Sequence, residues 1–403
     1  MSSTAAAPTS PSRIDESESL LVAISRYARG LDKLRRGNAV RPLQAGGETF
    51  PAMLEAMAAA TTSICLETYI ITADQTGDKF ADAMCERAAA GVKVRFMYDA
   101  VGGFGLATPY LKRLRDAGVE VVSWNPIAPW RTRLPWSHRD HRKILVVDDR
   151  IGFTGGINLA DEYAAVADGG GGWHDVHCEL RGPIARDLAR LFRSVWLMAG
   201  GTEYPAPPAA DDPDCERPGQ VAGRVIDNSR RRRSSSGAIR RSYLRAINAA
   251  RSTVHLENAY FLPDAGLRRA MRRAVRRGVD VAVIVPGHSD VRMIEFAGLY
   301  LYRTLSASGI RMLRWTGPMM HAKTAVIDGV WSTIGSYNLD ARSLRHNLEL
   351  TVEIIDRDVG ARMEQAWQID QAKTEAFDAS AWQRLSWWQR AAAWLAFRFR
   401  ALL

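Results

Sequence analysis

Short apolar runs alternate with longer amphipathic stretches along most of this chain. The runs ICLETYI (64–70) and KVRFMYD (93–99) are almost continuously apolar and short, a pattern typical of buried strands. Apolar positions three and four residues apart predict helices in FPAMLEAMAAA (50–60), GDKFADAMCERAAA (77–90) and AGLRRAMRRAVRR (265–277). Strands that alternate with helices predict an α/β fold.

Four stretches of the first half recur in the same order in the second half. The pairs are ICLETYI (64–70) and VHLENAYF (254–261), AAAGVKVRFMYD (88–99) and VRRGVDVAVIVP (275–286), DAGVEVVSW (116–124) and SASGIRMLRW (306–315), and HRKILVVDDRIGFTGGINLAD (141–161) and HAKTAVIDGVWSTIGSYNLDA (321–341). Internal repeats of this length indicate a duplication.

Composition then divides the chain into parts. MSSTAAAPTSPSR has no continuous apolar core behind a basic start, so it is interpreted as a disordered tail and not as a signal peptide. A stretch rich in Pro, Asp and Gly, GGTEYPAPPAADDPDCERPG, is typical of a linker. The predicted parts are a tail (1–13), a first α/β domain (14–200), a linker (201–222), a second α/β domain (223–375) and a C-terminal tail (376–403).

The charge balance favours phosphate-bearing partners. The sequence has 54 Lys plus Arg against 44 Asp plus Glu, a formal net charge of +10. Such a balance favours encounters with nucleic acid or anionic lipid and does not choose between them. The run NSRRRRSSSG (228–237) is either a solvated loop or a cationic loop that faces the phosphate of a substrate.

The cysteines and the longest apolar runs narrow the class of protein. The cysteines of the sequence are Cys65, Cys85, Cys178 and Cys215. Their spacing matches neither CxxC nor a zinc ribbon, so it indicates neither a disulfide framework nor a structural metal and fits a reducing cytoplasm. No run of 18 or more apolar residues predicts a spanning helix.

The fourth repeated stretch carries the candidate chemistry. Residues i and i+2 of a strand share a face, so His141 and Lys143 point the same way, as do His321 and Lys323. An apolar run follows each pair, and the Asp-Gly at 328–329 predicts a hairpin turn that returns the chain along WSTIG. The return strand then brings hydroxyl and amide groups near the histidine, from Ser336 and Asn338.

This set of side chains suits chemistry at a phosphodiester. A neutral imidazole attacks phosphorus and holds it covalently, while a second, protonated imidazole gives a proton to the departing oxygen. Lysine and asparagine side chains stabilise the charge on the non-bridging oxygens. One copy of the motif has only half of these parts, so the duplication supplies the second histidine.

The paired HxKxxxxD motifs resemble those of the phospholipase D superfamily, and the resemblance runs from about residue 45 to 370. Within the superfamily, several segments are similar to those of bacterial cardiolipin synthases: FPAMLEAM, ICLETYI, HRKILVVDDRIGFTGGINLADEY, WHDVHCELRGP (173–183), ENAYFLPD (257–264) and GSYNLDARSLRHNLE (335–349). The resemblance implies two duplicated α/β/α sandwich domains with mixed sheets, related by a pseudo-two-fold axis, with the active site at their interface.

The resemblance also implies roles for individual residues. His141 is the expected nucleophile and His321 the expected general acid, although the order can be reversed within the family. An acidic residue downstream of each motif orients the histidine of that motif, which matches Asp175 in the first half and Glu349 in the second. The catalytic set is completed by Lys143, Asp148, Lys323 and Asp328, of which the two aspartates are expected to support the site. The expected phosphate-binding positions are Asn158, Ser336 and Asn338. In the first half, Gly156 stands where the second half has Ser336.

The function that the resemblance implies is that of a phosphatidyltransferase of the cardiolipin synthase type. It works through a phosphatidyl-histidine on anionic phospholipids such as phosphatidylglycerol, or on phosphatidylethanolamine, and needs neither metal nor cofactor. The Trp- and Arg-rich segment 381–403 suits peripheral attachment at the cytoplasmic face of the cell membrane. A phospholipase D remains the main alternative, and a nuclease acting on nucleic acid or a non-catalytic membrane-binding protein is less favoured. The sequence leaves the oligomeric state open.

Overall fold

The computed structural model describes residues 20–30, 33–126, 138–228, 237–378 and 380–399. The predicted N-terminal tail (1–13) and the four arginines at 230–233 lie outside the described residues. The linker prediction 201–222 falls mostly on irregular structure, although a strand begins at Val221.

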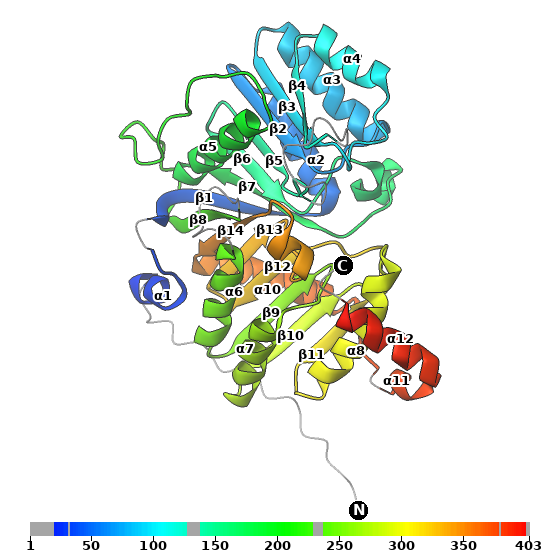
Figure 1. Cartoon of the computed structure of the whole chain (residues 1–403). Helices are drawn as coiled ribbons and strands as arrows, with labels where there is room; N and C mark the ends of the chain where they lie inside the picture. Colours follow the sequence, from blue (N-terminus) through cyan, green and yellow to red (C-terminus); the bar gives the residue numbers. More distant parts are fainter. Residues whose placement is uncertain (1–19, 31–32, 127–137, 229–236, 379, 400–403) are drawn as a thin grey trace, which may run out of the picture.

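The first half begins with a short helix and then alternates strands with helices (Figure 1). Its elements are α1 (Leu20–Tyr27), β1 (Arg35–Gln44), α2 (Ala45–Ala58), β2 (Ser63–Thr68), α3 (Gln75–Ala89), β3 (Lys93–Asp99), α4 (Thr108–Asp116), β4 (Glu120–Trp124), β5 (Ile144–Val147), β6 (Ile151–Gly155), β7 (Val176–Arg181) and α5 (Pro183–Met198).

The second half repeats this order and adds three C-terminal elements. Its elements are β8 (Val221–Asp227), α6 (Ala238–Ala249), β9 (Thr253–Asn258), α7 (Ala265–Arg276), β10 (Asp280–Val285), α8 (Arg292–Ser306), β11 (Arg311–Trp315), β12 (Lys323–Ile327), β13 (Trp331–Gly335), α9 (Ala341–Arg345), β14 (Leu350–Ile355) and α10 (Arg357–Gln371), followed by β15 (Thr374–Ala376), α11 (Ala381–Arg384) and α12 (Trp387–Arg398).

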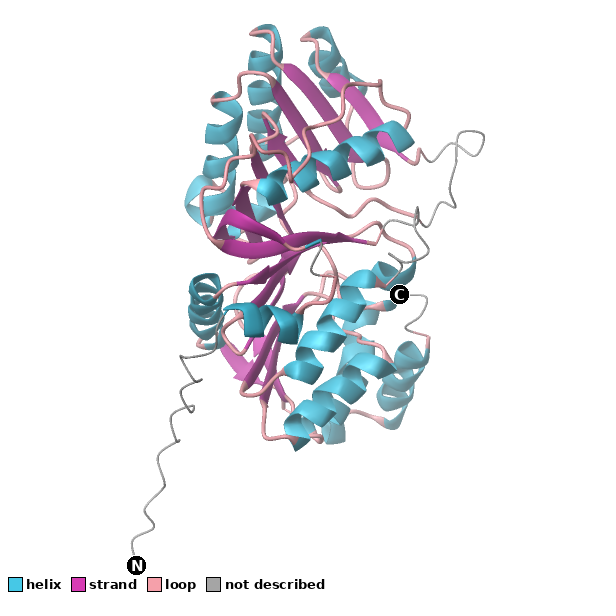
Figure 2. Cartoon of the chain, turned by 90° about the vertical axis from the view of Figure 1, so that its left-hand side faces the viewer, coloured by secondary structure: helices cyan, strands magenta, loops and turns pink. Residues whose placement is uncertain are grey.

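The described strands form one 15-stranded mixed sheet, which Figure 2 shows running through both halves. Their order is β15-β11-β10-β9-β12-β13-β14-β8-β1-β7-β6-β5-β2-β3-β4. The order of the first half, read outward from β1, matches that of the second half, read outward from β8, and these two strands pair antiparallel. A two-fold axis between them therefore relates the halves. The expected α/β fold with mixed sheets is confirmed, with the two half-sheets joined edge to edge.

Helices cover both faces of the sheet. α5 and α10 pack on one face near the join, where their apolar residues form a core with residues of both halves, such as Leu188, Ile334 and Trp367. On the other face, α2, α3 and α4 cover the first half, and α6 and α7 cover the second. α1 packs against the second half and not the first, because Ala23, Ile24 and Tyr27 are buried in the core of the second half.

Two repeated sequence signals explain how the strands are entered and left. Gly118 and Gly309 stand between a helix and a strand at φ of 91° and 83°, a backbone conformation that disfavours residues with a side chain. The predicted hairpin turn is confirmed, since Asp328 and Gly329 have φ of 53° and 60° between the paired strands β12 and β13.

Candidate active site

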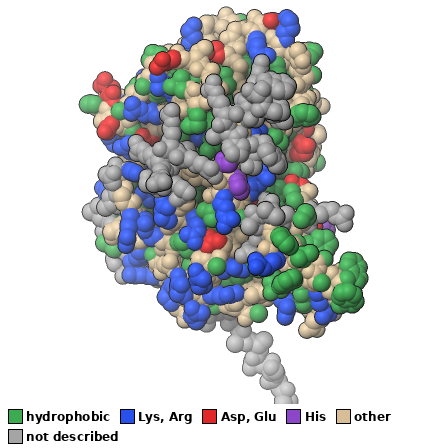
Figure 3. Space-filling view, viewed as in Figure 1, with side chains coloured by type: hydrophobic (Ala, Val, Ile, Leu, Met, Phe, Trp, Pro, Cys, Tyr) green, Lys and Arg blue, Asp and Glu red, His purple; other side chains and the backbone are tan. Residues whose placement is uncertain are grey.

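The two motif histidines line one cavity of about 390 Å³ at the boundary between the halves. Space-filling Figure 3 shows imidazole surface (purple) at this boundary. Both side chains are largely buried, with 9% and 6% of the His141 and His321 side chains exposed. The cavity is also lined by aromatic residues, amides and charged groups: Tyr69, Asn158, Tyr163, Trp173, Tyr260, Asp290, Asn338, Asp340 and Arg342. The fold therefore brings together two residues that lie 180 positions apart in the sequence.

Each histidine is held through its backbone by the opposite half. The His141 N–H donates to the carbonyl of Leu348 (2.9 Å), and the His321 N–H donates to the carbonyl of His174 (2.6 Å). In each case the residue after the acceptor is the acid that the sequence analysis selected. Two short segments, one from each half, thus fix the positions of the two imidazoles.

The carboxylates are also exchanged between the halves. Glu349 Oε2 lies 3.1 Å from His141 Nδ1, and Asp175 Oδ2 lies 2.7 Å from His321 Nδ1. Both acids are fully buried. Because a carboxylate accepts the Nδ1 proton, it fixes the tautomer in which Nε2 carries the lone pair, and that nitrogen is the one left for the cavity. This differs from the expectation that each acid orients the histidine upstream of it in its own half, because the order along the sequence does not show the exchange.

The motif lysines lie beside their histidines, as the strand pattern predicted. Lys323 Nζ is 2.8 Å from His321 Nδ1, and Lys143 Nζ donates to the carbonyl of His141 (2.7 Å). Burial lowers the pKa of Lys143 to about 7 and that of Lys323 to about 8, and in Lys143 the charge of Lys323 lowers it further. An anionic phosphodiester in the cavity would restore their charge, so these lysines are matched to an anionic ligand.

The electrostatics keep both imidazoles neutral near pH 7. Burial lowers the pKa of His321 to about 4, with a further lowering by Lys323. Burial and the nearby Lys143 lower the pKa of His141. Burial alone would raise the pKa values of Asp175 and Glu349, yet both are lowered, because cationic and imidazole partners outweigh burial. The acids are thus ionised, and a neutral imidazole is the nucleophilic form.

The two motifs differ at Gly156 and Ser336. Each of these residues suits the length of the acidic side chain beside it. A side chain at Gly156 would place a Cβ 2.2 Å from Asp175 Oδ1, so the glycine makes room for the shorter acid. The Ser336 hydroxyl instead donates to the longer acid, Glu349, and accepts from the N–H of Leu350 (3.1 Å). The Ser336 hydroxyl is thus occupied by the acid and does not line the cavity, and its expected contact with phosphate stays a prediction.

The two motif asparagines do line the cavity. The Asn158 amide donates to the Tyr163 hydroxyl (2.7 Å) and accepts from the N–H of Ile70 (3.1 Å), so internal bonds fix its orientation. Asn338 Oδ1 is buried and has no hydrogen-bond partner among the described residues. A buried amide without a partner is costly unless a ligand meets it, so Asn338 is the better candidate for direct contact with substrate.

Asp148 and Asp328, expected in the catalytic set, lie at the hairpin turns, one strand length away from the histidines. Asp328 accepts from the backbone N–H groups of residues 251, 252 and 253 (2.8–2.9 Å) and from the Tyr27 hydroxyl (2.5 Å). Asp148 accepts in the same way from the N–H groups of residues 61, 62 and 63 (2.8–2.9 Å). Their role is corrected to a structural one: each fixes the start of the neighbouring strand.

We expect Asp328→Ala to destabilise the fold by about 3 kcal/mol, because it leaves several buried donors without an acceptor. Thermal unfolding followed by circular dichroism measures this change. Turnover measured below the unfolding midpoint should stay within about threefold of that of the unmodified protein. A large loss of turnover with an unchanged midpoint would return Asp328 to the catalytic set.

The sequence analysis did not single out the aromatic wall of the cavity. The Tyr69 ring lies edge-on to His141 (4.9 Å between centroids), and Tyr163 and Trp173 lie beside His321 (5.6 and 6.0 Å). The Tyr163 hydroxyl is also 3.2 Å from His321 Nδ1. Tyr69 and Tyr260 each closely follow a repeated strand, a signal that the sequence carried without any indication of which way the rings point.

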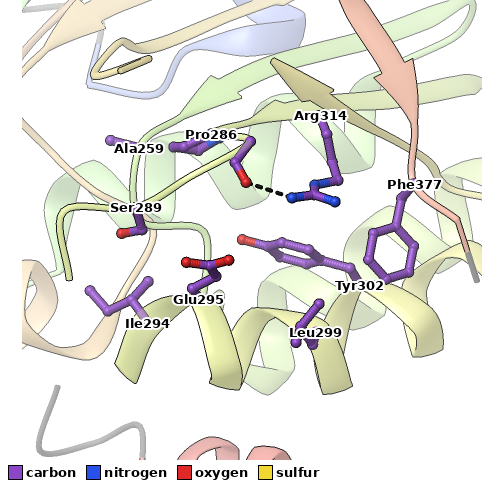
Figure 4. A pocket seen from close by; sticks show the side chains of 10 residues that line it. Ala259, Pro286, Ser289, Ile294, Glu295, Leu299, Tyr302, Arg314 and Phe377 are labelled. Atoms are coloured by element: carbon purple, nitrogen blue, oxygen red, sulfur yellow. Dashed lines mark hydrogen bonds between the residues drawn. The ribbon is translucent and has the colours of Figure 1, made fainter. Parts of the chain in front are cut away.

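A second, smaller cavity lies behind the first and shares Ile294 with it (Figure 4). Its volume of about 30 Å³ suits one or two water molecules and not a substrate. Arg314 crosses it and donates to the carbonyl of Gly287 (2.5 Å). This bond anchors the loop that supplies Asp290 to the main cavity.

The fold defines a class of proteins in which two similar halves each bring one His-x-Lys motif to a shared cavity, and comparisons with known proteins give the family. The family described as "Cardiolipin synthase, PLD-like domain" matches residues 53–169 and 243–370. Among solved structures, the phosphatidylserine synthase of Haemophilus influenzae superposes with a TM-score of 0.66 at 13% identity, covering 90% of this chain and 95% of that one. That likeness shows a shared fold.

Curated relatives agree with the family. A cardiolipin synthase of Geobacillus sp. (strain WCH70) is 32% identical over 323 residues, which cover 79% of this chain and 63% of that protein. Cardiolipin synthase A of Pseudomonas aeruginosa (strain LESB58) is 33% identical over 341 residues, which cover 84% of this chain and 68% of that protein. The chain belongs to the phospholipase D-like family of cardiolipin synthases. It spans a little under two thirds of the length of the Geobacillus relative.

Proposed function

We propose that this protein is a phosphatidyltransferase of the cardiolipin synthase type, which moves a phosphatidyl group between phospholipids. The observation that carries the proposal is the pair of histidines, each held by a carboxylate at Nδ1, on the wall of one cavity together with two lysines beneath them. Such a transfer needs a nucleophilic imidazole, a proton donor and cationic side chains near the phosphate.

The reaction proceeds in two displacements at phosphorus. In the first, Nε2 of His141 attacks the donor phosphate, the bond to the leaving headgroup oxygen breaks, and protonated His321 gives that oxygen a proton. Binding of the anionic phosphate raises the pKa of His321, because a nearby negative charge favours the imidazolium, and the imidazole takes this proton from water. In the second, an acceptor hydroxyl gives its proton to His321 and attacks phosphorus, and the P–N bond to His141 breaks.

The named substrates are phosphatidylglycerol as donor and phosphatidylglycerol or phosphatidylethanolamine as acceptor. Two molecules of phosphatidylglycerol would give cardiolipin and free glycerol. The assay mixes the purified protein with phosphatidylglycerol vesicles, with and without phosphatidylethanolamine, and follows lipids by mass spectrometry. Cardiolipin together with glycerol supports the proposal. Phosphatidic acid as the sole product would indicate a phospholipase D, and absence of any lipid product would overturn the proposal.

The C-terminal helix supports placement at a membrane surface. In α12, exposed apolar side chains cover one wide arc of the helix at 100° per residue, with Arg398 among them: Trp387, Trp388, Trp394, Leu395 and Phe399. The opposite side packs on α8, where Phe397 contacts Tyr300 (5.0 Å between ring centroids). Aromatic rings beside arginine suit the headgroup region of an anionic bilayer.

The apolar surface continues from α12 to the cavity. Met293 and Phe296 on α8 are exposed, on the side of α8 that carries Tyr300, and Val291 and Ile294 line the cavity itself. Figure 3 shows the hydrophobic side chains (green) gathered over α8 and α12 at the lower right of this face. Among the described helices, none has the length and apolar character of a membrane span. We propose peripheral binding at the cytoplasmic face, where the free cysteines remain reduced.

The double variant Trp387→Ser, Trp388→Ser should lower partitioning onto anionic vesicles roughly tenfold or more, because two exposed rings no longer enter the headgroup region. Cosedimentation with phosphatidylglycerol vesicles measures this. Phe104→Ser is the matched control, since Phe104 is as exposed as Trp387, both at 80%, and lies in the other half. Unchanged partitioning of the double variant would contradict a membrane-binding role for this surface. A double variant that elutes from a sizing column as a smaller species than the unmodified protein would also contradict it, because the surface would then be an interface between copies of the chain.

A further inference from the structure

The two halves of the site differ at the residue that precedes each acid. Leu348 and His174 hold equivalent places: each accepts a hydrogen bond from the N–H of a motif histidine, and each lies in an isolated parallel bridge, with Asp140 and Met320 respectively. Leu348 is buried among apolar residues of the core. His174 instead carries a titratable side chain into a polar cluster, so the duplication is not symmetric at this point.

The cluster around His174 comes from the second half. His174 Nε2 lies 3.0 Å from Asp370 Oδ2 on α10, and one ligand-type atom from each of His174, Glu257 and Asp370 lies within 4.8 Å of the others. The imidazole also stacks on Trp315 at 4.8 Å. Since His174 belongs to the first half, this contact ties the segment that carries Asp175 to the body of the second half.

The first half also has two carboxyl groups around one cation, and there the cation is permanent. Glu67, the repeat counterpart of Glu257, lies 3.0 Å from Arg142 Nε, and Arg142 Nη2 donates to Asp140 (2.8 Å). Two carboxyl groups surround one cation in each half. The guanidinium stays charged at any accessible pH, whereas an imidazolium loses its charge near neutrality.

We propose that His174 is a positioning residue, whose charged side chain between Glu257 and Asp370 fixes the segment that presents Asp175 to His321. This inference rests on the proposed transfer reaction, in which His321 handles the proton. When His174 is neutral, the segment loses its ionic anchor and the proton-donating half of the site works less well. The His141 half does not respond to this titration, because the cation between Glu67 and Asp140 is Arg142, which stays charged.

The groups that face His174 determine the direction of the pH effect. Burial lowers the pKa of His174, but the nearby carboxyl groups of Asp370 and Glu257 outweigh burial and raise it above 6.5. Burial raises the pKa of Glu257 to about 7. Asp175 adds negative charge beside His174, and Lys373 lies 3.6 Å from Asp370. A raised folded-state pKa means that the anchor is complete below pH 6.5 and is lost as the pH rises through the folded value.

The test compares kcat of the unmodified protein with that of His174→Gln from pH 5.5 to 9, on dispersed short-chain phosphatidylglycerol. We expect a kcat ratio of roughly tenfold at low pH that falls towards one at high pH, with KM little changed. His255→Gln is the matched control. His255 also pairs with carboxylates, at 2.9 Å from Glu364, and stacks on Trp367 at 3.8 Å, and both partners lie on α10 and not on the segment that carries Asp175.

A second readout does not depend on activity. Amide hydrogen exchange at residues 173–176 should be faster in His174→Gln than in the unmodified protein at pH 6, and unchanged in His255→Gln. If the protein makes no transfer product but this exchange difference is present, the proposed function fails and the positioning role stands. A kcat ratio that does not vary with pH, unchanged exchange, or a stoichiometric divalent metal bound between these side chains would each overturn the inference.

Discussion

His141→Ala should abolish phosphatidyl transfer to every acceptor, with a loss of at least roughly 10⁴-fold, because no nitrogen remains to form the covalent intermediate. His321→Ala should lose roughly 10²- to 10⁴-fold on phosphatidylglycerol, since only proton transfer to the leaving glycerol is removed. A phosphatidyl ester of p-nitrophenol separates the two roles. Its leaving group needs no proton, so the first displacement should survive in His321→Ala and not in His141→Ala.

Release of p-nitrophenol in a single-turnover absorbance assay measures this difference, and mass spectrometry of acid-quenched protein detects the phosphatidyl-histidine. Both variants must keep the thermal unfolding midpoint of the unmodified protein within a few degrees, and His255→Gln serves as a folded histidine control. The opposite pattern, with His141→Ala rescued by the better leaving group, would exchange the roles of the two histidines.

Asp175→Asn and Glu349→Gln should each reduce transfer roughly 10²- to 10⁴-fold, because an amide does not stabilise the imidazolium or fix the tautomer as a carboxylate does. The exchange of acids between halves makes a sharper prediction. Asp175→Asn should behave like His321→Ala and recover p-nitrophenol release from the ester, whereas Glu349→Gln should keep its loss on the ester, because the defect lies at the nucleophile. If each acid served the histidine of its own half, these two outcomes would be reversed.

The double variant His321→Ala, Asp175→Asn adds a further check. Because the acid acts through the histidine, the double variant should be little worse than His321→Ala alone. The pH profile should respond as well: Asp175 raises the pKa of His321, so its removal moves the alkaline limb of kcat, where His321 loses the proton that it donates, to lower pH. Independent, multiplicative losses in the double variant would show that Asp175 acts on substrate directly.

Much of the fold followed from local sequence signals. Apolar runs, glycines such as Gly118 before strands and the Asp-Gly turn at Asp328 specify backbone conformations within a few residues, so they are legible without a structure. The repeated His-x-Lys pairs likewise singled out the two histidines that line one cavity. The register of i and i+2 along one strand is a local property, and it correctly placed Lys323 beside His321.

Contacts of side chains outside their own strand were not legible in this way. The sequence suggested a supporting role for Asp148 and Asp328 at the site itself, but backbone amides of neighbouring strands use both carboxylates. Ser336 was expected at the phosphate, but its hydroxyl serves Glu349. In both cases the hydrogen-bond partner belongs to a different segment. A motif does not indicate which groups of other segments will bond to its polar side chains.

The sequence by itself determined the duplicated α/β fold, the family and the identity of both histidines, because each depends on patterns within one repeat and on their recurrence. The tertiary structure alone decided which acid serves which histidine, which aromatic rings enclose them and that His174 joins the two halves. Those features arise where segments from opposite halves meet across the β1–β8 join, and spacing along a single chain does not encode a meeting of that kind.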